Sequence, residues 1–283
     1  MFKRALLSAC SLAILGALPA EAGCLDDIKA AGVLRSGNGV MGLKPSVWQG
    51  DDGKLHGFEW DIFQELGKRI GVPKVEYVVT DWTSLIPGLK AARWDIILSG
   101  MSVTQERVQG AGIDYTRPYF MLYDQVIVPG SSPIKTMDDL KGKILASTLG
   151  TMDSVNAHML VDEGKAGSVL DFNTFGEPFM ALQNGQADAV ILDQGTFYGQ
   201  KESMPDLRVV GDPIFYHPKP EWAEAEAKAP YVLGGTAIGV RRECGDLLAA
   251  LDKALADMDA DGTRKAIISK YGIWSPAQEK MMK

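Results

Sequence analysis

The chain has 283 residues, of which 46% are hydrophobic and 23% charged, and its formal net charge at pH 7 is −7. An acidic balance without a basic stripe argues against nucleic acid as a partner, because binding to nucleic acid needs lysines and arginines that neutralise phosphates. The length fits two α/β lobes of ordinary size.

The N-terminus has the three parts of a secretory signal peptide. Lys3 and Arg4 precede an apolar core over residues 5–18, and residues 19–22 end in a small-x-small cleavage site. This core of fourteen residues, nearly all apolar, is too short to span a bilayer, which takes about 20 apolar residues. We predict cleavage after Ala22, export to the periplasm, and a mature chain of 261 residues with a charge of −8, since Lys3, Arg4 and Glu21 are lost.

Cysteine usage fits an exported protein. Cys10 leaves with the signal peptide, and Cys24 and Cys244 remain in an oxidising compartment, where a pair usually joins. We therefore predict a Cys24–Cys244 disulfide, with two separate buried thiols as the alternative. A lipid anchor at Cys10 or Cys24 is a lesser alternative, because the sequence before each cysteine lacks part of the required pattern. The three histidines are scattered, so neither a metal site nor a cofactor is expected.

The first third of the chain reads as alternating strands and helices. Apolar residues at positions 58, 62, 66 and 70 form one helical face, followed by a glycine. The expected elements are a helix over residues 25–31, a strand over 33–38 with a glycine-rich loop to residue 45, a hairpin turn at 51–54, a helix over 57–71 and a strand over 74–80.

A buried strand over residues 96–98 is expected to end in small polar residues. Ser99, Gly100 and Ser102 then place backbone N–H groups and hydroxyls outside the carboxyl end of the strand, where ligands bind in open α/β sheets. Arg107 follows and offers a fork of donors that matches a carboxylate. The alternative makes Arg107 an exposed residue at a helix start and the serines an N-cap.

The same pattern occurs twice in the chain. Residues 84–99 resemble residues 178–193, with a short helix, a polar turn, an aspartate, a buried strand and a polar end in each copy. Two lobes built alike would face each other, with residues 99–107 on one side and Asp193 on the other. Chance similarity between α/β segments remains the alternative.

Several ordered motifs carry a resemblance to a known family. They lie at residues 53–62, 82–89, 95–107, 114–119 and 256–271, and together they cover essentially the whole mature chain. In them the chain resembles the family 3 periplasmic solute-binding proteins, which deliver polar amino acids and related compounds to ABC transporters. The resemblance implies a small amino-acid-like ligand, an inner-membrane ABC permease as partner, and a monomer.

The resemblance also implies a fold. That fold is α/β, a two-lobed periplasmic binding protein fold of type II, in which each lobe is a sheet flanked by helices and two crossover strands form the hinge. We expect crossings near residues 123–126 and 235–238, so that lobe one comprises residues 23–124 and 236–283 and lobe two residues 125–235. Residues 216–230 form a proline-rich excursion longer than the family usually carries.

The family's site is carried over by motif and is a binding site without catalytic residues. Arg107 would hold the ligand carboxylate, with the Ser102 N–H and Thr151 beside it, and the Gly100 carbonyl and Asp193 would bind the α-ammonium. Thr151 and Asp193 are alternatively ordinary helix N-caps. Trp82 is either a pocket wall or packing between helix and strand. The predicted ligand-binding set is Trp82, Ser99, Gly100, Ser102, Arg107, Thr151 and Asp193.

One loop departs from the family. The loop after the first strand usually supplies an aromatic residue that covers the ligand, but residues 38–45 have none. Met41 and Leu43 could form a softer lid, or Trp48 could reach in, or the ligand could be something other than a standard amino acid. Lys44 is a possible cation for a second acid group, although an exposed lysine is the simpler interpretation.

The expected function is capture of an amino acid or amino-acid-like solute and its delivery to a permease by lobe closure. One alternative is an exported enzyme on the same scaffold, such as a cyclohexadienyl dehydratase-like protein. That reaction needs a general acid in the cleft, and we expect no His or Glu in the motifs that line it. Another alternative is a ligand-sensing subunit for a membrane receptor.

Overall fold

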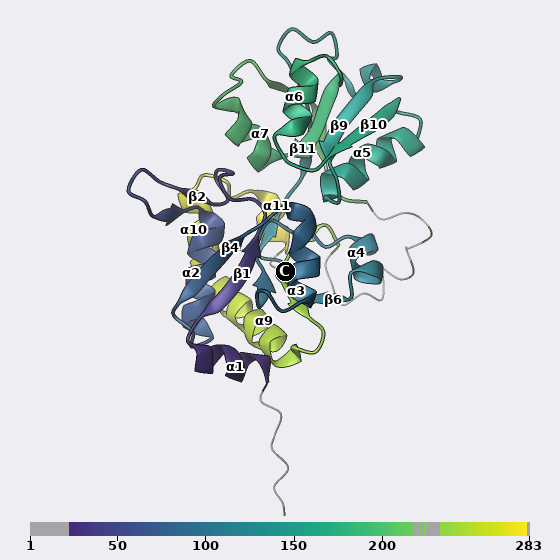
Figure 1. Ribbon diagram of the computed structural model, residues 1–283. Helices are drawn as coiled ribbons and strands as arrows, with labels where there is room; N and C mark the ends of the chain where they lie inside the picture. Colours follow the sequence, from purple (N-terminus) through teal and green to yellow (C-terminus); the bar gives the residue numbers. More distant parts are fainter. Residues whose placement is uncertain (1–22, 218–220, 222–223, 225–232, 282–283) are drawn as a thin grey trace, which may run out of the picture.

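The computed structural model describes residues 23–217, 221, 224 and 233–281. The predicted signal peptide and most of the 216–230 excursion lie outside these residues. The described chain forms two lobes, each built around a five-stranded sheet with helices against its faces (Figure 1). In its described part, no helix is both long enough and apolar enough to cross a membrane.

The sheet of the first lobe has the strand order β4 (Val75–Val79), β1 (Leu34–Asn38), β5 (Ile96–Ile97), β14 (Gly239–Arg241) and β6 (Ile113–Tyr115). β1 is parallel to β4 and β5, whereas β14 is antiparallel to β5 and β6. A hairpin of β2 (Trp48–Gln49) and β3 (Leu55–His56) forms around the predicted turn. The helices of this lobe are α1 (Cys24–Ala31), α2 (Phe58–Arg69), η1 (Trp82–Ser84), α3 (Leu85–Lys90), α4 (Gln105–Gly110), α9 (Gly245–Ala260), α10 (Thr263–Lys270) and α11 (Pro276–Met281).

The sheet of the second lobe repeats this arrangement strand for strand. Its order is β10 (Ser168–Phe172), β9 (Ile144–Thr148), β11 (Ala189–Asp193), β8 (Asp124–Val128) and β12 (Arg208–Ile214). β9 is parallel to β10 and β11, and β8 is antiparallel to β11 and β12. Its helices are η2 (Met137–Leu140), α5 (Met152–Asp162), α6 (Glu177–Gln183) and α7 (Gln194–Lys201).

The repeat seen in the sequence therefore falls once in each lobe, as α3–β5 and as α6–β11. The repeated aspartate has one role in both copies. Asp95 Oδ2 accepts a hydrogen bond from the Arg35 N–H at 2.8 Å, and Asp188 Oδ2 accepts one from the Ile144 N–H at 2.8 Å. Each carboxylate thus satisfies a backbone donor at the start of the neighbouring parallel strand.

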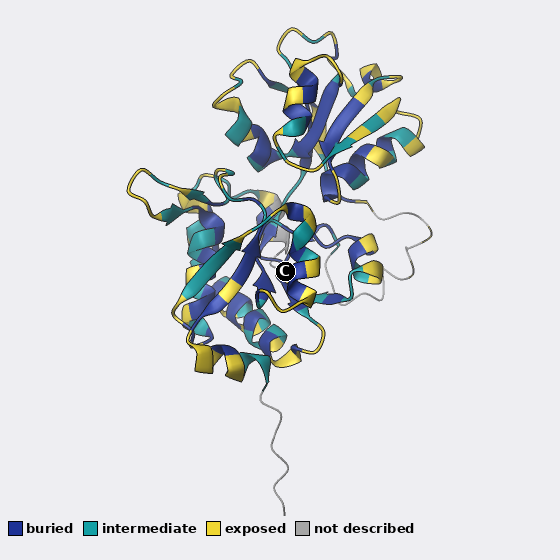
Figure 2. Cartoon of the chain, viewed as in Figure 1, coloured by how far each residue is buried: buried dark blue, intermediate teal, exposed yellow. Residues whose placement is uncertain are grey.

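The buried residues of α2 follow the helical periodicity of the sequence. Phe58, Ile62 and Leu66 of α2 are all buried in the core of the first lobe, on the face that the sequence predicts. α1 ends at Gly32, whose φ of 71° suits a residue without Cβ. In the second lobe, apolar side chains pack on both faces of the sheet, and the central strands are buried (Figure 2). The alternation of buried strands and amphipathic helices gives each lobe its own core, which consists of two clusters of apolar side chains.

The chain passes between the lobes twice. β7 (Phe120–Met121) leads into β8, and β13 (Gly235–Thr236) pairs antiparallel with β7 on the return. The C-terminal helices hold this region. Gln278 of α11 makes two hydrogen bonds to the backbone of Met121, at 2.9 and 2.8 Å. The buried Arg264 of α10 donates to the Tyr119 carbonyl at 2.9 Å.

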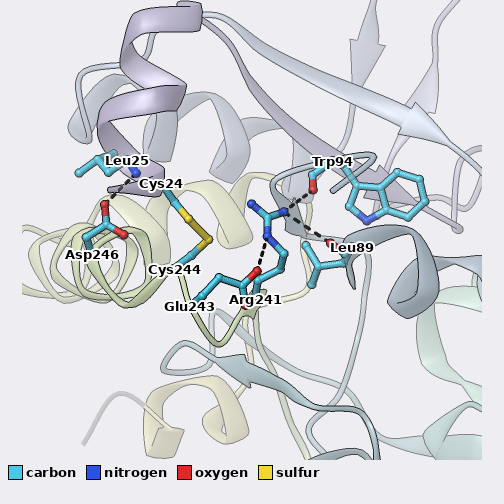
Figure 3. Close-up of a disulfide and its surroundings, with 8 residues drawn as sticks. All are labelled: Cys24, Leu25, Leu89, Trp94, Arg241, Glu243, Cys244 and Asp246. Atoms are coloured by element: carbon cyan, nitrogen blue, oxygen red, sulfur yellow. Dashed lines mark hydrogen bonds and ion pairs between the residues drawn. A yellow bond between two sulfur atoms is a disulfide. The ribbon is translucent and has the colours of Figure 1, made fainter. Parts of the chain in front are cut away.

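The predicted disulfide is confirmed. Cys24 begins α1, Cys244 directly precedes α9, and the sulfur atoms of the two residues are bonded (Figure 3). A hydrogen bond of 2.8 Å from the Leu25 N–H to Asp246 Oδ2 joins the same two helices. The first residues after the predicted cleavage site are therefore fixed to the long C-terminal helix of the first lobe.

Candidate functional site

A pocket lies between the two lobes and takes residues from both. It encloses about 540 Å³, including space open to solvent. Its lining contains Trp82, Gly100, Ser102 and Arg107 from the first lobe and Thr151 and Asp193 from the second. Of the residues predicted to bind ligand, Ser99 lies behind this lining, where it is buried and its Oγ accepts a hydrogen bond of 2.9 Å from the Gly39 N–H.

Arg107 is buried in the pocket wall. Its side chain points from the first turn of α4, and the residue is only 8% exposed. The guanidinium donates two hydrogen bonds to backbone carbonyls. One runs from Nη1 to the Ser102 carbonyl, and the other runs from Nη2 to the Gly150 carbonyl at 2.6 Å. Burial lowers the pKa of Arg107, because the surroundings disfavour the charged form. The interpretation of Arg107 as an exposed helix-start residue is therefore wrong.

Contacts between the lobes surround Arg107. The Gly150 carbonyl, just before α5, also accepts a hydrogen bond of 3.2 Å from Trp82 Nε1. The ring of Trp82 meets that of Phe175 edge to face, with centroids 5.6 Å apart, and the Arg107 Cζ lies 5.5 Å from the Trp82 centroid. Trp82 is thus a pocket wall that packs against both lobes.

Thr151 and Asp193 begin helices of the second lobe. Thr151 Oγ1 accepts from the Ser154 N–H at 3.1 Å and caps α5. Asp193 accepts from the Gly195 and Thr196 N–H groups at 2.7 and 3.1 Å and caps α7. Both residues cap helices, as the alternative interpretation expects, and both line the pocket, so a ligand role for them stays a prediction. Burial raises the pKa of Asp193.

Comparisons with known proteins point to one family. The family model of the bacterial extracellular solute-binding proteins, family 3, matches residues 39–273. A probable histidine-binding protein of Campylobacter jejuni is 28% identical over 221 residues, 78% of each chain. The histidine-binding periplasmic protein of Escherichia coli is 30% identical over 231 residues, 80% of this chain and 83% of the other.

Solved structures agree as well. A mutant of the arginine-binding protein ArgBP from T. maritima has a TM-score of 0.70 and 28% identity, covering 88% of this chain and 98% of the other. The ancestral amino-acid-binding protein AncCDT-1, described as a precursor of cyclohexadienyl dehydratase, has a TM-score of 0.69 and 28% identity, covering 87% and 98%. The chain belongs to family 3 of the bacterial extracellular solute-binding proteins.

The pocket of this family 3 protein contains a glutamate that the sequence reasoning missed. Glu59, in the first turn of α2, is fully buried and lines the pocket. Its Oε1 accepts hydrogen bonds from the Gly100 N–H at 2.7 Å and from the Tyr119 hydroxyl. Burial raises the pKa of Glu59 to about 7. The expectation that no Glu lines the cleft is therefore wrong. Glu59 lies in the first turn of α2, next to the core residue Phe58, and its side chain lines the pocket.

Asp153 was missed in the same way. It lies in the first turn of α5, two residues after Thr151, and is buried in the pocket lining. Burial raises the pKa of Asp153 to about 6. Its position next to a predicted ligand residue at a helix start was the available signal. In the part of the chain that is described, no group of three or more His, Cys, Asp or Glu side chains could hold a metal ion.

Because the loop over residues 38–45 has no aromatic residue, other apolar side chains line this part of the pocket. Val40 and Leu43 line the pocket from the first lobe, and Phe175 contributes an aromatic ring from the second. Trp48 instead packs against His56 and Tyr271, with centroids 5.9 and 6.1 Å away, so the proposal that Trp48 reaches into the pocket is wrong.

Lys44 is engaged outside the pocket lining. Its Nζ pairs with the Glu202 carboxylate of the second lobe at 3.1 Å.

Proposed function

We propose that this protein captures an amino acid or amino-acid-like solute in the periplasm and presents it to an inner-membrane ABC permease. Arg107, with the Ser102 N–H and Thr151, holds the ligand carboxylate, and Asp193, with the Gly100 carbonyl, binds the α-ammonium. The observation that carries the proposal is a pocket between two lobes with the buried Arg107 guanidinium on one wall and the half-buried Asp193 on the other. These charges match the two ends of an α-amino acid.

The working form is a monomer without a nucleic-acid partner, exported and freed of residues 1–22. Its division into lobe one (residues 23–124 and 236–283) and lobe two (residues 125–235) gives closure a physical basis. A ligand that contacts both lobes binds the closed form better than the open form, and it can shift the equilibrium only by that difference in affinity. The permease then recognises the closed form. A sensing role in front of a membrane receptor would use the same step.

A thermal-melt panel tests the proposal. Mature protein is heated with each amino acid, with opines and with small amines. A ligand at about a hundredfold over its dissociation constant contributes roughly 2.7 kcal/mol, which at this size raises Tm by roughly 5–10 °C. We expect one or a few stabilising ligands. A panel with no shift from any compound would rule the amino-acid function out.

Calorimetry on Arg107→Ala tests the carboxylate site. Removing one partner of a buried charge pair costs about 2–5 kcal/mol, or roughly thirty- to several-thousandfold in affinity. Arg107→Lys should recover little affinity, because an ammonium cannot form the two-pronged contact. The control is Arg242→Ala, whose side chain is 57% exposed. Unchanged affinity in folded Arg107→Ala protein would mean that the carboxylate binds elsewhere.

A second candidate function is an exported dehydratase, and one observation favours it. The pKa of Glu59, raised to about 7, allows this carboxyl group to keep a proton in a large fraction of molecules near neutral pH, as a general acid must. AncCDT-1, named as a precursor of cyclohexadienyl dehydratase, has the same fold. Ultraviolet detection of an aromatic product from a cyclohexadienyl acid separates the two functions. For a binding protein we expect no turnover.

A further inference from the structure

The pocket holds more carboxyl groups than an ordinary amino acid can match with positive charge. Glu59, Asp153 and Asp193 line it, whereas Arg107 is the single cationic side chain in the described lining. An α-amino acid with an uncharged side chain brings one carboxylate for Arg107 and one ammonium for the acids. Its binding would leave carboxyl groups buried without a positive partner, which is costly in a medium of low dielectric constant.

A fourth carboxyl group stands directly behind Asp153. Asp124, at the start of β8, is fully buried, and its carboxyl group is near enough to that of Asp153 for the two to interact electrostatically. Asn156 Nδ2 donates to Asp124 Oδ2 at 2.6 Å. Two buried carboxylates near each other repel, which favours keeping one of the two groups protonated. The pair therefore has capacity for one further positive charge.

No described side chain supplies that charge. Among the described residues, none of Asp124, Asp153 and Asp193 forms an ion pair within 4.0 Å. Arg107 directs Nη1 and Nη2 to the Ser102 and Gly150 carbonyls instead. For the same reason burial raises the pKa of Asp153 and Asp193 and takes that of Asp124 well above its usual range.

Other acceptors in the pocket are also without partners. Glu59 Oε2, Ser102 Oγ and Thr236 Oγ1 are buried, line the pocket, and have no hydrogen-bond partner among the described residues. Buried polar atoms are almost always paired in native proteins. The two hydroxyls can donate or accept, whereas the Glu59 oxygen as a carboxylate can only accept, so a ligand with several N–H groups could pair with all three.

The rest of the lining suits a methylene chain. Trp82 and Phe175 meet edge to face, and Val40 and Leu43 add aliphatic surface. A side chain with an apolar stem and a cationic end would contact these walls and the acids together.

We propose that the pocket selects a basic amino acid, with the side-chain cation against Asp153 and with Asp124 behind it, an inference that rests on the amino-acid function proposed above. The α-ammonium then uses Asp193, and the α-carboxylate uses Arg107. Asp153 is the residue that determines specificity for the side chain.

Calorimetry with matched ligand pairs tests the proposal. Arginine is compared with citrulline, which has nearly the same shape without the charge, and lysine with norleucine. Pairing a buried charge is worth about 2–5 kcal/mol, so at least one basic member should bind roughly thirtyfold or more tightly than its neutral match. If neither basic member binds more tightly than its match while some amino acid still binds, the cationic subsite is wrong and amino-acid capture stands. If no amino acid binds, both proposals fail.

Asp153→Asn provides the second arm. It should weaken arginine or lysine binding by roughly thirtyfold or more and leave the neutral member within about threefold, because an amide keeps the shape and removes the charge. Asp162→Asn, at an exposed position on the same helix α5, is the matched control. Equal loss for charged and neutral ligands in Asp153→Asn would overturn the role of Asp153 in specificity.

Discussion

At the scale of single residues, Glu59 makes stability depend on pH. Its pKa is about 7 in the folded protein and near 4.5 in an unfolded chain. Between these values the folded state binds more protons than the unfolded state, so stability falls as pH rises from about 4.5 to about 7. At about 1.4 kcal/mol per pKa unit, the total fall is about 3 kcal/mol.

Glu59→Gln should remove this fall, because an amide can still accept from the Gly100 N–H and the Tyr119 hydroxyl. We expect the variant to gain about 3 kcal/mol over the native protein between pH 4.5 and pH 8. Urea denaturation at both pH values measures the difference. Glu243→Gln, at a side chain 69% exposed, should show no such gain. Parallel pH curves for Glu59→Gln and the native protein would contradict the assignment.

Glu59 and Asp153 also mark the limit of sequence reasoning at this scale. The helical period correctly predicted that Phe58 and Ile62 face the core, since they follow a regular spacing. Glu59 is buried for another reason, because Gly100 and Tyr119 close over it from distant parts of the chain. The position of Arg107 in the pocket lining could be predicted, because its spacing from Ser102 belongs to a recognisable motif. No local pattern predicts a contact made by folding alone.

At the scale of elements, the repeated aspartates support the parallel strands of both lobes. We predict that Asp95→Ala and Asp188→Ala each lower the free energy of unfolding by about 0.5–1.5 kcal/mol, because each removes a hydrogen bond to a solvent-exposed backbone N–H at a strand start, which water can partly replace. The two losses should be similar, since both bonds are 2.8 Å long.

Chemical denaturation measures both losses. The control is Asp51→Ala at the exposed tip of the β2–β3 hairpin. A loss at only one of the two positions would show that the sequence repeat does not carry a shared structural role. The equivalence could be predicted from the sequence because both copies keep the aspartate directly before a buried strand. The order of the strands in each sheet could not, because it depends on pairings between distant segments.

At the scale of the whole molecule, the Lys44–Glu202 pair spans the two lobes at the surface. Its side chains are 46% and 64% exposed, and exposed ion pairs contribute about 0–1 kcal/mol. We predict that Lys44→Ala and Glu202→Ala each change ligand affinity by less than about fivefold, far less than Arg107→Ala. Titrations at low salt and at about 0.5 M salt should converge as the charges are screened. A coupling energy between the two residues that persists at high salt in a double-mutant cycle would contradict this prediction, because an exposed ion pair should be screened.

We expect the Cys24–Cys244 disulfide to affect the stability of the fold and not the affinity for ligand. It joins α1 to α9 within the first lobe, at the end away from the second lobe (Figure 1), and neither cysteine lines the pocket. Replacing both cysteines by serine should lower the free energy of unfolding by about 2–5 kcal/mol and leave the dissociation constant within about twofold. Denaturation and calorimetry on one preparation measure both quantities. An affinity that falls with the bond would contradict this separation.

Resistance to unfolding and ligand recognition therefore depend on different parts of this molecule. A copy that folds without oxidation would still bind its ligand but would open more often to proteases, which cleave in proportion to the open population when opening is fast. Survival of the protein would then report the oxidising capacity of its compartment, whereas uptake per surviving molecule would not.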